Sequence, residues 1–126
     1  MTSSVRTARE VVEAYNLELW NQQRLELADE IIADTMIRHD VGESHTLTRA
    51  DALKRVIDTW AQMDTLRFDL NIVIDGGDGE HVAMVWDSTM AKDDNEVKVA
   101  SIEVFRVVNG QIVEVWNCGY KLGVWS

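Results

Sequence analysis

The chain has 126 residues, of which 46% are hydrophobic and 27% charged, and this composition is typical of one globular domain. Its formal net charge of −10, with no basic cluster to offset it, excludes a nucleic-acid partner and disfavours anionic membrane surfaces. Cys118 is the single cysteine, so an internal disulfide is excluded and the cytoplasm is the expected location. The N-terminus has no apolar signal core, and no apolar run approaches the ~20 residues that span a bilayer.

The first half of the chain is predicted to be helical. Apolar residues recur every three or four positions from Ser4 to about Trp20, which predicts a first helix. A second, shorter helix fits residues 25–33. The stretch Thr48-Arg49-Ala50-Asp51 has the form of a capping box with Asp in place of Glu, and it predicts the start of a third helix that continues through Trp60.

The second half changes to a period of two, which is typical of strands. Four strands are predicted, at residues 66–74, 81–90, 97–108 and 111–120. A short apolar strand between the second and third helices ends at Asp40, before a turn at Gly42. Helices followed by an antiparallel meander predict an α+β fold over residues 1–126. We expect a cone-shaped roll, with three N-terminal helices packed on one face of a curved, mostly antiparallel sheet.

The turn at Asn109-Gly110 decides which residues share a face of the last hairpin. It fits either a two-residue loop or a type I turn with Gly110 as a bulge. The bulged register predicts one face with Ser101, Glu103, Phe105, Val107, Val113, Val115, Asn117 and Gly119, and the other with Ile102, Val104, Arg106, Ile112, Glu114, Trp116 and Tyr120. Both faces are largely apolar and the helices cover only one, so the other is predicted to form a homodimer through the sheet.

Three polar residues are expected inside this fold. Tyr15 lies on the apolar stripe of the first helix, Asp40 ends the short strand, and Glu103 alternates with inward-facing apolar residues. A carboxylate among apolar side chains costs several kcal/mol unless it is paired or protonated, so Glu103 requires an explanation. A protonated acid beside a tyrosine hydroxyl supplies two donors for an oxyanion, and a second, ionised acid nearby can remove a proton. The alternative is that Tyr15 is an ordinary core tyrosine and Asp40 an ordinary turn acid.

The stretches His39–Gly42, Ile102–Val107 and Asn109–Trp116 resemble the nuclear transport factor 2-like superfamily, which includes ketosteroid isomerase and the SnoaL-like polyketide cyclases. The resemblance to the isomerase implies that Asp40 is the general base, Tyr15 the oxyanion-hole tyrosine and Glu103 the protonated acid. Val41 replaces the usual proline, Glu103 replaces an aspartic acid and His39 precedes the base, so a steroid-shaped substrate is not implied.

The resemblance to the cyclases implies a different site. Their catalytic aspartic acid corresponds to Asn117, and an amide is not a base at neutral pH. Asn117 is therefore predicted to hydrogen-bond a ligand carbonyl. The other residues that we predict to bind substrate are His39, Trp60, Trp86, Asp87 and Phe105.

Two functions stay open at this point. The first is a cofactor-independent enzyme that acts on a hydrophobic, carbonyl-bearing small molecule by proton abstraction, leading to isomerisation, cyclisation or dehydration. The second is a small-molecule-binding or assembly module on the same fold without chemistry. No metal site is expected, because His39 and His45 have no third ligand at a suitable spacing. No cofactor motif is present.

Overall fold

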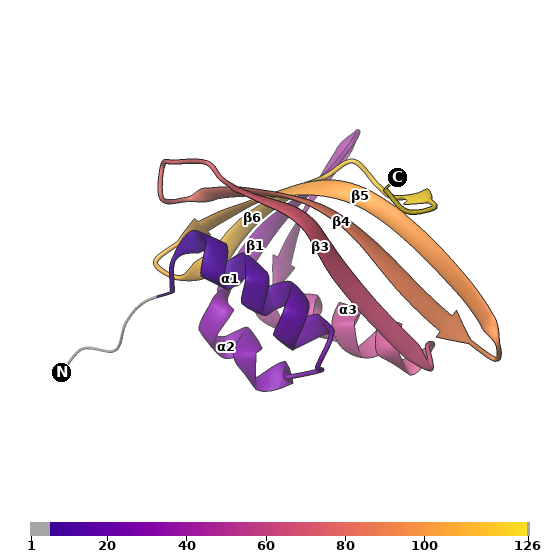
Figure 1. Ribbon diagram of the computed structural model, residues 1–126. Helices are drawn as coiled ribbons and strands as arrows, with labels where there is room; N and C mark the ends of the chain where they lie inside the picture. Colours follow the sequence, from indigo (N-terminus) through magenta and orange to yellow (C-terminus); the bar gives the residue numbers. More distant parts are fainter. Residues whose placement is uncertain (1–5, 126) are drawn as a thin grey trace.

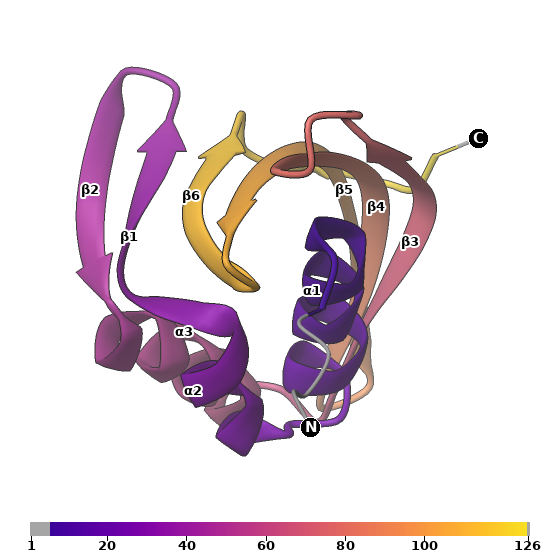
Figure 2. The same cartoon turned by 90° about the vertical axis from the view of Figure 1, so that its left-hand side faces the viewer.

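A strongly bent sheet forms one layer of the structure, and the helices lie against its concave face (Figures 1 and 2). The computed structural model describes residues 6–125. Within this range the strand order is β2-β1-β6-β5-β4-β3, with β7 beside β5. The pairs are antiparallel except β1 with β6, which run parallel. The predicted α+β fold, with helices on one face of a curved and mostly antiparallel sheet, is confirmed.

The predicted elements occur in the predicted order, and β2 and β7 are strands that were not predicted. The strands are β1 (Ile32–Asp40), β2 (Glu43–Thr48), β3 (Thr65–Asp75), β4 (His81–Lys92), β5 (Asn95–Val108), β6 (Gln111–Asn117) and β7 (Lys121–Leu122). The helical segments are α1 (Ala8–Ala14), the π-helix η1 (Tyr15–Trp20), the 3-10 turn η2 (Leu25–Leu27), α2 (Ala28–Ile31) and α3 (Arg49–Ala61).

The first helix begins at a capping box. The Thr7 hydroxyl accepts from the Glu10 backbone N–H at 3.1 Å, and the Glu10 carboxylate accepts from the Thr7 N–H at 2.9 Å. The predicted start at Ser4 lies outside the described residues. The helix changes to π geometry at Tyr15 and continues so to Trp20, and π segments are frequent at functional sites.

The second predicted helix is wrong at its C-terminal end. It ends at Ile31 instead of residue 33, and Ile32 already belongs to β1, where it pairs with Ile112 of β6. Two β-branched residues at this point suit a buried strand, and pairing with β6 outweighs the local helical pattern. The third helix begins as predicted, because Thr48 and Asp51 form the reciprocal capping box.

The alternation predicted for residues 66–74 breaks in the middle of β3. The register with β4 shifts between Leu70 and Ile72. As a result Ile72 and Ile74 are 51% and 54% exposed, while Val73 packs against the core. A bulge reverses the face of each later side chain, so the period of two predicted over residues 66–74 holds only as far as Leu70.

The last hairpin uses the two-residue loop, in which Asn109 and Gly110 have φ of 51° and 76°. Val107 therefore pairs with Ile112, and the extra residue sits at Val113 in β6. Because this bulge lies within β6, beyond the turn, the strand pairs that follow it are the predicted ones. Glu103 pairs with Asn117 and Phe105 pairs with Val115. The predicted inward position of Val113 is wrong, because Ile112 is the buried neighbour of Val107.

Two further expectations concern the surface of the molecule. No helix in the described part of the chain is long and apolar enough to cross a membrane. The convex face of the sheet carries exposed apolar side chains, including Ile37 and Ile102 at 39% and 44% exposure. The homodimer through this face stays a prediction.

Candidate functional site

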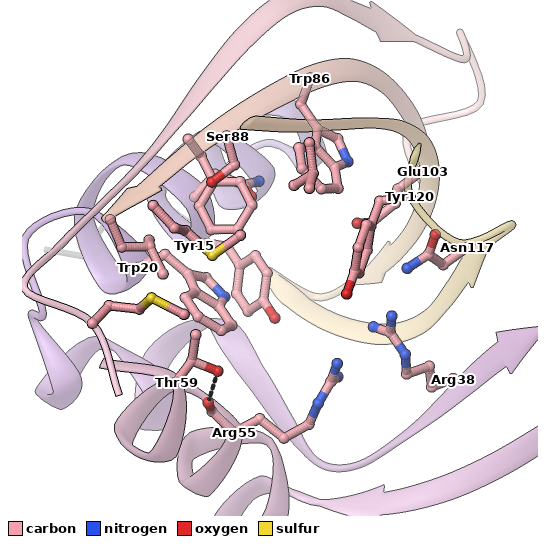
Figure 3. Close-up of a pocket in the computed structure, with 16 residues that line it drawn as sticks. Tyr15, Trp20, Arg38, Arg55, Thr59, Trp86, Ser88, Glu103, Asn117 and Tyr120 are labelled. Carbon is pink, nitrogen blue, oxygen red and sulfur yellow. Dashed lines mark hydrogen bonds between the residues drawn. The ribbon is translucent and has the colours of Figure 1, made fainter. Parts of the chain in front are cut away.

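A cavity of about 330 Å³ lies between the first helix, α3 and the concave face of the sheet. One wall is apolar, and its residues are Trp20, Met63, Leu66, Phe68, Met90 and Val99. The opposite end is polar, and its residues are Tyr15, Arg38, Arg55, Glu103, Asn117 and Tyr120 (Figure 3). Such a division suits a small molecule with an apolar body and a polar group at one end.

Glu103 is the acid of the cavity. It projects from the inner face of β5, two residues before the core residue Phe105. Burial raises the pKa of the Glu103 carboxyl above its ordinary value, and Asp40 adds to the rise. Arg38, Arg55 and the Trp86 indole N–H favour the ionised form, but they do not offset the burial. Glu103 is therefore a proton acceptor stronger than an exposed carboxylate.

Tyr15 shares the cavity with Glu103 as predicted. It begins the π-helical segment, and its ring packs edge-on against Phe105 with centroids 5.8 Å apart. Its hydroxyl points toward the polar end of the cavity (Figure 3). Burial raises the pKa of the Tyr15 hydroxyl, so it stays protonated and acts as a hydrogen-bond donor.

Asn117 also lines the cavity, at the end of β6 and directly across from Glu103. Its side-chain oxygen accepts a hydrogen bond from the Gly119 backbone N–H at 2.8 Å. The amide nitrogen is left to face the cavity, where it is a donor for a ligand oxygen (Figure 3).

Two buried polar atoms in the cavity wall lack partners. Trp86 Nε1 and Ser88 Oγ are inaccessible to solvent and have no hydrogen-bond partner within residues 6–125. The Trp86 N–H nevertheless acts on the Glu103 carboxyl, and neither atom is accessible from the cavity, so the two atoms are not evidence of a ligand. Trp86 was a predicted binding residue. Ser88 was missed, although it continues the inward alternation of Val82, Met84 and Trp86 along β4.

The sequence prediction also missed two arginines and a tyrosine. Arg38 points inward from β1, and Arg55 reaches the cavity from α3 (Figure 3). The sequence pattern could have shown both positions. Arg38 follows the buried Met36 by two residues and so lies on the same face of β1, and Arg55 shares a helix face with Ala52 and Val56. Tyr120 was predicted on the opposite face of a strand. It lines the cavity because β6 ends at Asn117 and the chain turns at Gly119, whose φ is 85°.

Asp40 does not line this cavity, contrary to the role predicted for it. Its carboxylate lies beside the Arg38 guanidinium at 3.6 Å and is 35% exposed at the rim. It shares the inner side of β1 with Arg38, which does line the cavity. Of the three predicted catalytic groups, Tyr15 and Glu103 line the cavity, while Asp40 lies at its rim and acts electrostatically on Glu103.

Two predicted binding residues lie on the other side of the sheet. His39 alternates with Arg38 and Asp40, so its ring is on the convex face, where Nε2 lies 2.5 Å from a Glu114 carboxylate oxygen. The ring also stacks on Trp116 with centroids 5.1 Å apart. Asp87 lies between the inward residues Trp86 and Ser88 and so faces outward. The prediction that His39 and Asp87 contact the ligand is wrong for this cavity.

Trp60 and Phe105 stand behind the cavity wall instead of lining it. The Trp60 indole N–H donates to the Trp20 carbonyl at 2.7 Å, which holds α3 against the first helix. Phe105 is 1% exposed and supports the Tyr15 ring. Both residues support groups that line the cavity, and neither of them lines it.

A metal-like cluster exists at the β1–β2 hairpin, away from the cavity. Donor atoms of Asp40, Glu43 and His45 lie within 4.8 Å of one another. The spacing in sequence did not reveal it because the hairpin brings the three side chains together. Glu43 and His45 are exposed and contact each other at 3.1 Å, an arrangement common for surface ion pairs.

Comparison with known proteins agrees with this architecture. Residues 12–115 match the SnoaL-like domain family, so the chain belongs to the SnoaL-like family. A candidate polyketide cyclase from Acidithiobacillus ferrooxidans is 22% identical, with 92% of this chain and 89% of that chain covered and a TM-score of 0.75. No curated protein matches the sequence.

Two other solved structures share the fold at lower identity. SalBIII, an epoxide hydrolase/cyclase-like enzyme with a role in pyran ring formation in the polyether salinomycin, is 19% identical, with 94% and 95% of the two chains covered and a TM-score of 0.74. An LEH-like epoxide hydrolase from Mycobacterium tuberculosis is 16% identical, with 90% and 82% covered and a TM-score of 0.73. These similarities establish the fold.

Proposed function

We propose that this protein is a cofactor-independent enzyme that moves a proton on a carbon next to the carbonyl group of a hydrophobic small molecule. The observation that carries the proposal is the meeting of Glu103, whose pKa is raised, and the Tyr15 hydroxyl at the polar end of one cavity. Perturbed acids that share a cleft with a donor are characteristic of catalytic sites.

In this proposal Glu103 is the base. Its ionised carboxylate takes the proton from the carbon next to the carbonyl, and the electrons of the broken C–H bond form the carbon–carbon double bond of an enolate. The negative charge moves to the carbonyl oxygen, which accepts hydrogen bonds from the Tyr15 hydroxyl and the Asn117 amide. Glu103 then returns the proton, and the same residue serves as base and acid.

The surroundings of Glu103 favour this step. Donors fixed before the reaction stabilise charge that develops on the oxygen, and the buried cavity strengthens each of these interactions. Arg38 adds positive charge, and Asp40 positions it through the contact at 3.6 Å. Asp40 is thus assigned a positioning role in place of the predicted role as base.

Isomerisation, cyclisation and dehydration all begin with such a step. The solved neighbours include cyclase-like and epoxide hydrolase-like enzymes, which is compatible with a reaction of the cyclase type. The alternative is a binding module without chemistry. A cavity with an apolar wall and a polar end suits a ligand under either function, so catalysis has to be tested separately.

The test uses 2-tetralone, a hydrophobic ketone with exchangeable protons next to its carbonyl. Hydrogen–deuterium exchange is followed by NMR in D2O with wild-type protein, Glu103→Gln, Tyr15→Phe and the control Glu96→Gln, whose acid is exposed at the β4–β5 hairpin. We expect Glu103→Gln to lose about 10²-fold or more of the catalysed rate, Tyr15→Phe to lose about 10²-fold, and the control to keep it. Wild-type exchange no faster than in buffer, or full exchange with Glu103→Gln, contradicts the proposal.

A further inference from the structure

Two guanidinium groups enter the polar end of the cavity from different elements. Arg38 comes from β1 and Arg55 from α3, and their heads point toward one another in front of Tyr15 and Glu103 (Figure 3). A chain with a net charge of −10 has many acids available to neutralise arginines. Arg55 is exposed at the mouth of the cavity and Arg38 is half-buried, yet their heads face each other, and this arrangement of like charges requires an explanation.

Arg38 and Arg55 have few carboxylate contacts within the described chain. Arg55 is the one arginine among residues 6–125 without a carboxylate within 4.0 Å. Arg38 has a single contact, the 3.6 Å approach to Asp40, which is long for a charge-assisted hydrogen bond. Glu103, the acid between them and the sheet, makes no hydrogen bond to either guanidinium within the described chain. The donors of both groups are free for a ligand.

We infer that the substrate carries a carboxylate that Arg38 and Arg55 hold together, so that it is a hydrophobic keto acid. Arg55 has no carboxylate partner in the described chain, and the planar fork of arginine matches the two oxygens of a carboxylate. The apolar wall around Trp20, Leu66 and Phe68 receives the body of the molecule. This inference rests on the proposed function and names the substrate class for the same site.

The two guanidiniums share the polar end of the cavity with the groups that act on the carbonyl. Arg38 and Arg55 both act electrostatically on the Tyr15 hydroxyl and on Glu103. A carboxylate held by the guanidiniums thus lies in the same cavity as the carbonyl oxygen that meets Tyr15.

The test compares two probes of nearly the same shape, cinnamate and cinnamamide, by isothermal titration calorimetry. The proteins are wild type, Arg55→Met and the control Arg67→Met, which removes an exposed arginine of β3 that pairs with Asp69. We expect wild type to bind cinnamate about ten- to a hundredfold more tightly than cinnamamide, because a charge-assisted contact is lost in the amide. Arg55→Met should lose most of this preference, and the control should retain it.

The outcomes separate this inference from the proposed function. Equal affinities for the two probes, no binding of cinnamate, or a preference unchanged by Arg55→Met overturn the carboxylate site. If this happens while tetralone exchange still depends on Glu103, the enzyme acts on neutral ketones. If the preference for cinnamate is present and the exchange is absent, the cavity binds an acid without performing proton transfer.

Discussion

Replacing Glu103 by Gln should change how the free energy of unfolding depends on pH. The folded-state pKa of Glu103 is raised, mainly by burial, whereas the unfolded chain has the ordinary value near 4.5. The folded protein therefore holds this proton more tightly than the unfolded chain. Stability contributed by the protonated group is complete below pH 4.5 and is lost as pH rises through the folded-state pKa.

The amount of unfolding free energy that is lost on ionisation follows from the difference between the folded-state and unfolded-state pKa of Glu103. Each unit by which folding raises the pKa removes about 1.4 kcal/mol of unfolding free energy once the group is ionised in both states. Gln has nearly the same shape and no charge, so Glu103→Gln removes this loss. The variant should match the wild type at acid pH and be the more stable protein at pH 8.

The assay is urea unfolding followed by tryptophan fluorescence at several pH values between 4.5 and 8, with Glu96→Gln as the control. The difference between wild type and Glu103→Gln should grow with pH, while the control follows the wild type. A difference that is independent of pH shows that burial does not raise the pKa of Glu103. The assignment of Glu103 as the proton-transfer group then loses its physical basis.

Two further predictions concern packing and assembly. Phe105→Ala should lower the unfolding free energy by about 3–5 kcal/mol, because it leaves a cavity beneath the Tyr15 ring, and a loss below 1 kcal/mol in urea unfolding would contradict this packing. Sedimentation at micromolar concentration should show a dimer for the wild type and a monomer for Ile102→Lys, which places a charge on the convex apolar face. A monomeric wild type shows that the face is not a dimer interface.

Patterns confined to a single element were read correctly from the sequence. The capping box at Thr48 and the inward position of Glu103 depend on neighbouring residues and on strand alternation. The bulges after Leu70 and at Val113 could not be read in the same way. A bulge adds one residue to one strand only, so it is decided by the fit against the partner strand.

The residues of the candidate site also differ in whether a local sequence pattern could predict them. Tyr15 and Glu103 were found because each interrupts an apolar face of its own element, and Asn117 was found through the resemblance to the cyclases. The assignment of Asp40 depended on the resemblance to ketosteroid isomerase, and the structure instead places Arg38 nearer the cavity centre. Arg55 had a readable helix position, but a charged side chain on a partly exposed helix is ordinary until its lack of an acid partner is known.

The sequence by itself determined the α+β class, the order of the elements and the presence of an acid on an inward face. These follow from periodicity and capping, which act over a few residues. Only the tertiary structure decided which groups share the cavity. Closure of the sheet around the helices brings β1, α3 and β5 to one place, and it sets Arg38, Arg55 and Glu103 around one cavity. The pKa of an acid and the partner of an arginine depend on that space, which no local pattern describes.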